Sequence, residues 1–238
     1  MGDHEQGSVD AGVRRSVRVS SRSGRVEIIA EPRADVVARK GGRSMVVDSS
    51  GERVTVSSRS SALEVRVPEG TDVVIGTVSG TVTCTGPLGH VAVNTLSARV
   101  TIEDAAEVDV RSVSGVLKVA ACRGEVRCDV ISGRAEINSA GSVRLSTKSG
   151  RITAREVRGK VRARAVSGGI KVAVTETPLD IKVEAISGKV QVRVPTGARP
   201  AVRLTTKSGR VISRLEEGDD GDLSARTVSG RILLDEAP

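Results

Sequence analysis

The sequence contains no phenylalanine, tyrosine or tryptophan. This absence excludes functions that depend on ring faces, such as base stacking on single strands, cation–π cages and most lectin-like sugar platforms. The apolar residues, 38% of the chain, are mainly Val, Ile, Leu and Ala. A core built from them has no large ring to anchor it, so many small side chains must pack in regular layers.

Histidine and cysteine are also scarce. The three cysteines, Cys84, Cys122 and Cys128, form no CxxC pair and no Cys/His cluster, so zinc and a disulfide framework are not expected. Cys122 and Cys128 flank a turn, which leaves a bridge open, although buried free thiols are the simpler interpretation. The sequence has no phosphate loop, metal motif or triad spacing. We therefore predict no catalytic residue, cofactor, metal or small-molecule substrate, and no enzyme.

No stretch of the chain reaches the length of a transmembrane helix, and the N-terminal "MGDHEQGSVDAGVRR" lacks the apolar segment of a secretory signal. We therefore expect a cytoplasmic location. Lys and Arg number 37 against 29 Asp and Glu, which gives a net charge of +8. This excess favours anionic partners such as nucleic acid, phospholipid or an acidic polymer, although an ordinary basic surface explains it as well.

A Ser-Gly pair between two apolar stretches, as in "VISGRAEI" (130–137), recurs along the chain. We take the Ser of each pair as a marker and add Ser97 of "LSARV" as a degenerate member; the spacing is then 17 to 21 residues. The markers are Ser79, Ser97, Ser114, Ser132, Ser149, Ser167, Ser187, Ser208 and Ser229. A period near twenty with such frequent glycine predicts stacked strand–turn units and excludes helices.

Apolar residues fall in fixed columns when the units are aligned on the marker. Val126, Val143 and Val161, for example, all stand six residues before it, and the neighbours of such columns are mostly polar. Alternation with one buried side is the strand signal, and stacking makes each column an aliphatic ladder. We predict an all-β solenoid of about nine two-strand rungs over residues 73–238. Gly permits a tight corner there, and Ser bonds the backbone or the next Ser.

Residues 13–72 lack this regular spacing but still contain strand patterns, separated by turns at Gly24, Gly51 and "PEG" (68–70). Strands joined by short turns favour an antiparallel sheet or small sandwich. We expect this antiparallel region to cap the solenoid, because an open end would present unpaired backbone groups. Residues 1–12 are predicted to be a disordered tail.

These features resemble a known bacterial family. "SGRVEIIAEP", "EVRVPEGTDVVIGTVSGTV", the Ser-Gly-x-Val units and the closing "VRLTTKSGRVISRLEEGDDGDLSARTVSGRILL" are similar to the β-strand-repeat domains of unknown function often labelled "putative adhesin", common in actinobacteria. The resemblance covers nearly all of residues 13–235. It implies a right-handed β-helix-like fold and supplies no reaction, and some relatives are linked to the cell envelope and its stress responses.

Two outward columns are basic, and the first departs from the Asp that the family usually carries two residues after the Ser. In that column we single out Arg99, Arg134, Arg151, Lys189, Arg210 and Arg231. Five residues before the Ser, the second column holds Arg127, Arg144, Arg162, Lys182 and Arg203. Stacked like charges suggest a face for an anionic polymer, an anionic membrane surface or an acidic protein. An ordinary solvated face with nearby acids, such as Asp129 and Glu184, is the simpler interpretation.

The position immediately before the Ser is aliphatic in most units, as at Ile131 and Ile186. Strict alternation would point these side chains outward, where an aliphatic stripe would mark an interface. Because corners break alternation, we expect instead that the corner rotates them into the core.

We interpret the chain as a non-enzymatic binding or scaffold module that engages an anionic partner or a cell-envelope component through its basic face. One alternative is a self-associating protein that forms fibres or oligomers through solenoid ends or sides. The other is a polysaccharide-acting β-helix enzyme, which would need clustered carboxylates and ring-faced sugar subsites; we find neither.

Overall fold

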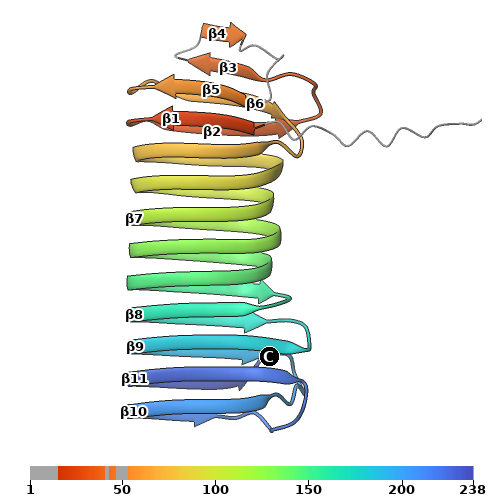
Figure 1. Ribbon diagram of the computed structural model, residues 1–238, viewed down its shortest axis with the longest axis vertical. Helices are drawn as coiled ribbons and strands as arrows, with labels where there is room; N and C mark the ends of the chain where they lie inside the picture. The colour runs from red at the N-terminus through yellow and green to blue at the C-terminus, as the bar shows by residue number, and fades with distance from the viewer. Residues whose placement is uncertain (1–15, 41–42, 47–52, 238) are drawn as a thin grey trace, which may run out of the picture.

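A computed structural model describes residues 16–40, 43–46 and 53–237. The regular secondary structure of these residues consists of β-strands alone. All of the strands join one sheet that coils into a tall stack (Figure 1). The strands are β1 (Ser16–Ser21), β2 (Arg25–Glu31), β3 (Val37–Lys40), β4 (Arg43–Val46), β5 (Arg53–Ser58), β6 (Leu63–Pro68), β7 (Asp72–Val157), β8 (Val161–Val174), β9 (Leu179–Val194), β10 (Ala201–Ser213) and β11 (Gly221–Glu236). The all-β prediction is confirmed. The tail expected at residues 1–12 lies outside the described residues.

The rungs stack in parallel with the markers in register. Ser149 of β7 pairs with Ser167 of β8, and Ser167 pairs with Ser187 of β9. Val143 likewise pairs with Val161, which puts the predicted aliphatic column on neighbouring rungs. Backbone hydrogen bonds between rungs run along the stack, about 4.8 Å per layer, so each rung is held by its neighbours.

The core is the narrow interior of the coil, filled by the aliphatic ladders. Val143, Val161 and Ile181 expose 1% or less of their surface. Stiff β-branched side chains suit this interior because each one packs against its counterpart a rung above and below, so no aromatic ring is needed to fill it.

At the C-terminal end the rungs are not stacked in chain order. The last strand, β11, lies between β9 and β10: Ile232 of β11 pairs with Val190 of β9 on one side and with Val211 of β10 on the other. The chain therefore passes over one rung position to form β10 and then turns back to fill it. Two connecting segments, 195–200 and 214–220, make this possible, and they meet where the Asp220 amide donates to the Arg199 carbonyl at 2.9 Å.

The N-terminal end shows the same kind of exchange. β1 lies between β5 and the start of β7, and β2 lies between β6 and β7, in both cases with parallel pairing. This differs from the antiparallel sheet that we expected for residues 13–72. Short turns and alternating residues fit a hairpin and a solenoid corner equally well, since both bury one side of each strand.

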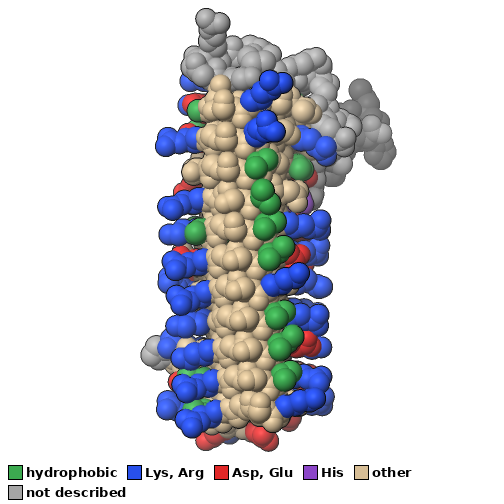
Figure 2. Space-filling model, turned by 90° about the vertical axis from the view of Figure 1, so that its left-hand side faces the viewer, with side chains coloured by type: hydrophobic (Ala, Val, Ile, Leu, Met, Phe, Trp, Pro, Cys, Tyr) green, Lys and Arg blue, Asp and Glu red, His purple; other side chains and the backbone are tan. Residues whose placement is uncertain are grey.

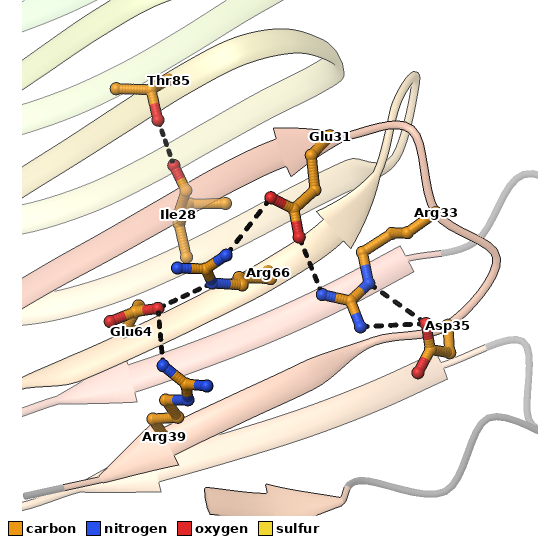
Figure 3. A network of polar contacts seen from close by, with 8 residues as sticks. All are labelled: Ile28, Glu31, Arg33, Asp35, Arg39, Glu64, Arg66 and Thr85. Carbon is orange, nitrogen blue, oxygen red and sulfur yellow. Dashed lines mark hydrogen bonds and ion pairs between the residues drawn. The ribbon is translucent and has the colours of Figure 1, made fainter. Parts of the chain in front are cut away.

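Antiparallel pairing is confined, among the described strands, to β3, which pairs with β4 and with β6. Ion pairs connect this end of the stack (Figure 3). The Arg66 guanidinium lies 2.8 Å from Glu64 and 3.4 Å from Glu31, and the Arg33 guanidinium lies 2.9 Å from Glu31. The hydrogen bond to Glu64 and the charge of Glu31 raise the pKa of Arg66 above its ordinary value. These contacts fasten β2, β6 and the segment before β3 to one another.

Three segments between the last strands contain Pro, Gly or Asp residues, which favour loops. Residues 175–178, 195–200 and 214–220 lie outside the strands and emerge on one side of the stack, opposite the Ser-Gly corners (Figure 1). The corner side is therefore uniform along the whole rod, and the variable side carries the insertions.

Candidate functional site: a basic face beside an aliphatic corner

The Ser-Gly corner fixes where the surrounding side chains point. Gly133 has φ of 144°, and a Cβ there would lie 2.3 Å from the carbonyl oxygen of Gly115 one rung away. Only glycine fits this close approach in the left-handed region. A hydroxyl two residues before the marker ties some of the corners: Thr77 Oγ1 donates to the Ser79 carbonyl at 3.0 Å, and Ser112 Oγ donates to the Ser114 carbonyl at 2.9 Å.

The residue immediately before the marker consequently points outward. Because the residue before it, such as Thr77 or Ala165, faces the core, alternation continues to the corner and places this position in solvent. Seven aliphatic side chains there expose between 39% and 53% of their surface; we call them the aliphatic column: Val78, Leu96, Val113, Ile131, Val166, Ile186 and Val228. The expectation that the corner rotates them into the core is wrong, since the bend begins only at the following Ser and Gly.

The aliphatic column runs straight along the narrow corner side of the rod (Figure 2). Lys148 interrupts it once, between Ile131 and Val166. At one end Arg22 takes the equivalent position, since its carbonyl accepts from the Ser79 amide at 3.1 Å. At the other end the insertion of β11 makes Lys207 the outermost residue. The column is thus bounded and broken by cations.

The cations predicted two residues after the marker all lie on one broad side of the rod, next to the corner, and all are exposed. We call them the basic face: Arg99, Arg134, Arg151, Lys189, Arg210 and Arg231. Lys189, Arg231 and Arg210 occupy consecutive rungs through β9, β11 and β10. No described carboxylate forms an ion pair with any member of the basic face.

The cations predicted five residues before the marker lie on the other broad side, and most of them are paired with carboxylates. Arg127 lies 2.7 Å from Glu125, Arg162 lies 2.6 Å from Asp180, and Lys182 lies 3.2 Å from Glu184. Arg144 shares Glu125 at 3.4 Å, whereas Arg203 forms no ion pair with a described residue. The sequence predicted that both columns form one basic face. In the structure they lie on opposite sides, and only the column five residues before the marker is largely paired with carboxylates.

On the paired side, the ion pairs lower the pKa values of two carboxylates. A hydrogen bond from Arg162 is the main cause that holds the pKa of Asp180 below its ordinary value. Hydrogen bonds from Arg164 and Lys182 likewise lower the pKa of Glu184. These carboxylates stay charged and keep their cations occupied, so this side has little charge left for an external anion.

A groove of about 540 Å³ crosses the basic face in its middle rungs. Arg134 and Arg151 line it together with three cations that the sequence analysis missed: Arg155, Lys171 and Arg193. Its one acidic lining residue is Glu136. These three cations stand four or six residues after the marker. Strand alternation continues past the basic column and points these positions to the same side, so the alternation alone would have predicted them.

The groove continues toward the corner as a hollow of about 1000 Å³. Gly169 contributes to it because it stands in the basic column between Arg151 and Lys189 and carries no side chain. The lining contains Arg134, Lys171 and backbone glycines but no carboxylate. Cations that line a hollow without a carboxylate favour the binding of anions there.

The thiols are free and buried, which rules out the bridge between Cys122 and Cys128. Burial raises the pKa of both Cys84 and Cys128 to about 12, so these thiols are protonated at neutral pH. In the part of the chain that the structure describes, no group of three metal-ligating side chains occurs, and no helix has the length and hydropathy to cross a bilayer.

The stack and its outward columns define a parallel β-solenoid repeat protein. The chain belongs to the Toastrack DUF4097 family, a match that extends over residues 15–234 and confirms the resemblance inferred from the repeats. A search of curated proteins finds no match. Among solved structures, a "putative cell adhesion protein" from Clostridium sporogenes ATCC 15579 is 7% identical over 96% of this chain and 95% of that chain, with a TM-score of 0.23.

Proposed function

We propose that this chain is a non-enzymatic binding module that holds an anionic partner against its basic face. The observation that carries this proposal is the contrast between its two broad sides. Most of the candidate cations on one side are paired with carboxylates, whereas Arg134, Arg151 and Lys189 project without an ionic partner around a groove. Unpaired like charges on neighbouring rungs repel one another, and a bound polyanion removes that repulsion.

Rigid spacing supports the same conclusion. The rungs lie about 4.8 Å apart, so the cations of the basic face stand one or two rung steps apart, and the face presents fixed charges at defined spacings to an extended anionic polymer or surface. A preorganised row loses little conformational entropy on binding. Affinity from such a row depends strongly on salt, because binding releases the counterions condensed on the polyanion.

Elution from immobilised heparin tests this proposal, with two variants of equal charge change. One variant carries Arg134→Gln, Arg151→Gln, Arg210→Gln and Arg231→Gln on the basic face. The matched control carries Arg127→Gln, Arg144→Gln, Arg162→Gln and Lys182→Gln on the paired side. We expect the basic-face variant to elute at clearly lower salt than the wild type and the control to elute close to it, because the control cations are already neutralised.

Equal losses in the two variants would show that only total charge matters, and the basic face would then have no special role. Thermal unfolding of each variant establishes that both remain folded.

Self-association is a second candidate, favoured by the outermost rung. β10 pairs only with β11 among the described strands, and its inward residues Val202, Leu204 and Val211 are only half-buried. An unpaired strand of this kind is a template for another chain. Sedimentation velocity over a range of concentrations tests it: a single monomer species at all of them excludes assembly through this end.

A further inference from the structure

We propose that the anionic partner is a phospholipid bilayer, which the rod contacts along its corner with the aliphatic column inserted between lipid headgroups. This inference rests on the proposed function, because the basic face supplies the charge attraction, and it adds the partner and a second contact surface. It starts from an observation that the basic face does not explain: seven aliphatic side chains stand half-exposed in a line.

The shape of the surface favours a bilayer over a folded protein. The aliphatic column lies on the narrow, convex side of the rod, and it runs straight from rung to rung (Figure 2). A folded partner would need a straight groove of matching length to cover it. A bilayer surface is flat and deformable, so it accepts a straight ridge without a dedicated groove, and its interior takes up aliphatic side chains.

The charges around the ridge are complementary to anionic headgroups. On one flank stand the cations of the basic face. The other flank belongs to the paired side: in the column three residues before the marker, Arg164 is paired with Glu184 at 2.6 Å and Arg111 with Asp109 at 3.8 Å, which leaves Arg226 without an ion pair to a described residue. Figure 2 shows Lys and Arg side chains projecting on both sides of the corner. Long basic side chains can reach headgroups while an apolar residue beside them enters the membrane.

The residues at the ends of the aliphatic column also support a bilayer as the partner. Arg22 and Lys207 terminate it, and Lys148 stands in its middle, so every residue of this ridge is either aliphatic or cationic from Arg22 to Lys207. A second copy of this chain is a poorer occupant. Corner-to-corner contact of two identical rods would place Arg and Lys flanks against each other, and like-charge contacts across an interface are costly.

Vesicle co-sedimentation tests the inference with phosphatidylcholine vesicles, with and without phosphatidylglycerol. The wild type is expected to bind the anionic vesicles and to leave the neutral ones largely unbound. A variant with Leu96→Gln, Ile131→Gln and Ile186→Gln should bind anionic vesicles at least about tenfold more weakly, because three inserted side chains lose their apolar transfer. The same variant should elute from heparin at the wild-type salt concentration, since its cations are unchanged.

A matched control carries Ile29→Gln, Val74→Gln and Leu233→Gln. These aliphatic residues are half-buried and lie on outward strand positions away from the corner. The control should bind vesicles as the wild type does, because the same chemical change outside the aliphatic column removes no inserted group.

Each remaining outcome decides a separate claim. Wild-type binding to heparin but not to anionic vesicles overturns the bilayer and leaves the proposed function standing. Undiminished vesicle binding by the corner variant shows that charge alone attaches the protein and removes the role of the aliphatic column. A wild-type dimer that the corner variant dissociates, without vesicle binding, assigns the ridge to a second copy instead. If the wild type binds neither heparin nor anionic vesicles, the proposed function itself is contradicted.

Discussion

Val228 of β11 lies in register with Ile186 of β9, although Lys207 stands between them in the sequence. The pairing arises because β11 fills the rung position between β9 and β10. It joins Val166, Ile186 and Val228 into one uninterrupted aliphatic segment and moves Lys207 to the end of the ridge. The composition of the corner surface therefore depends on strand order as well as on the repeat.

Disulfide trapping tests this strand order directly. Lys189 pairs with Arg231, and Arg231 pairs with Arg210, so one rung lies between Lys189 and Arg210. The variant Lys189→Cys with Arg231→Cys should oxidise readily, because neighbouring rungs bring Cα atoms to about 5 Å, within the span of a disulfide. Lys189→Cys with Arg210→Cys should stay reduced at about 10 Å. Peptide mass spectrometry distinguishes the two, and the opposite result would restore stacking in chain order.

The glycine corner predicts a large difference between two Gly→Ala substitutions. Gly133→Ala should lower the free energy of unfolding by about 2 kcal/mol or more, since the new Cβ meets the Gly115 carbonyl in a left-handed backbone. Gly76→Ala is the control: no atom lies within 4 Å of its Cβ position, so the change should be neutral or slightly stabilising. Urea denaturation measures both, and equal effects would contradict the corner geometry.

The hydroxyl beneath the corner predicts opposite effects at two buried threonines. Thr77→Val should destabilise the protein by about 1 kcal/mol, because it removes the hydrogen bond to the Ser79 carbonyl. Thr147→Val should stabilise it by a similar amount, since Thr147 Oγ1 is buried and makes no hydrogen bond. Thermal unfolding compares them; destabilisation by Thr147→Val would show that its hydroxyl has a partner.

The buried thiols predict a loss of stability at alkaline pH. Burial raises the pKa of Cys84 and Cys128 from the ordinary 9.0 to about 12, so the folded state holds protons that the unfolded state releases. Their contribution is complete below pH 9.0 and is lost as pH rises toward 12, at about 1.4 kcal/mol per pH unit for each thiol. Urea denaturation across this range should give a flatter profile for Cys84→Ala with Cys128→Ala. An unchanged slope would contradict it.

The sequence was most informative where one local rule repeats in every rung. The Ser-Gly spacing and the aliphatic columns predicted parallel ladders such as Val143 on Val161, because a stacked rung buries the same positions each time. The cations of the basic face were found in the same way. The groove cations Arg155 and Lys171 lie outside the two basic columns, although the same alternation places them on the side of the basic face.

Ion pairing of the candidate cations required the structure. Arg162 and Arg151 look alike in the sequence, yet Arg162 contacts Asp180 from the next rung, eighteen residues away, and Arg151 forms no ion pair with a described carboxylate. Pairing depends on which acids lie one rung above or below on the same side. The register keeps each column aligned even where the rung length changes, so whether a cation is paired depends on the residue types in its neighbouring columns.

By itself the sequence determined the coil, its aliphatic interior and its glycine corners, because these follow from period and side-chain volume within each rung. Only the tertiary structure decided that the first and last rungs are inserted between their neighbours, and that the residue before each Ser faces solvent. Rung order is decided by which exposed strand edge a returning segment reaches, and parallel edges of similar sequence offer nearly equivalent partners. The corner direction is decided by a glycine backbone that bends only after the residue before the Ser, so alternation continues up to the corner.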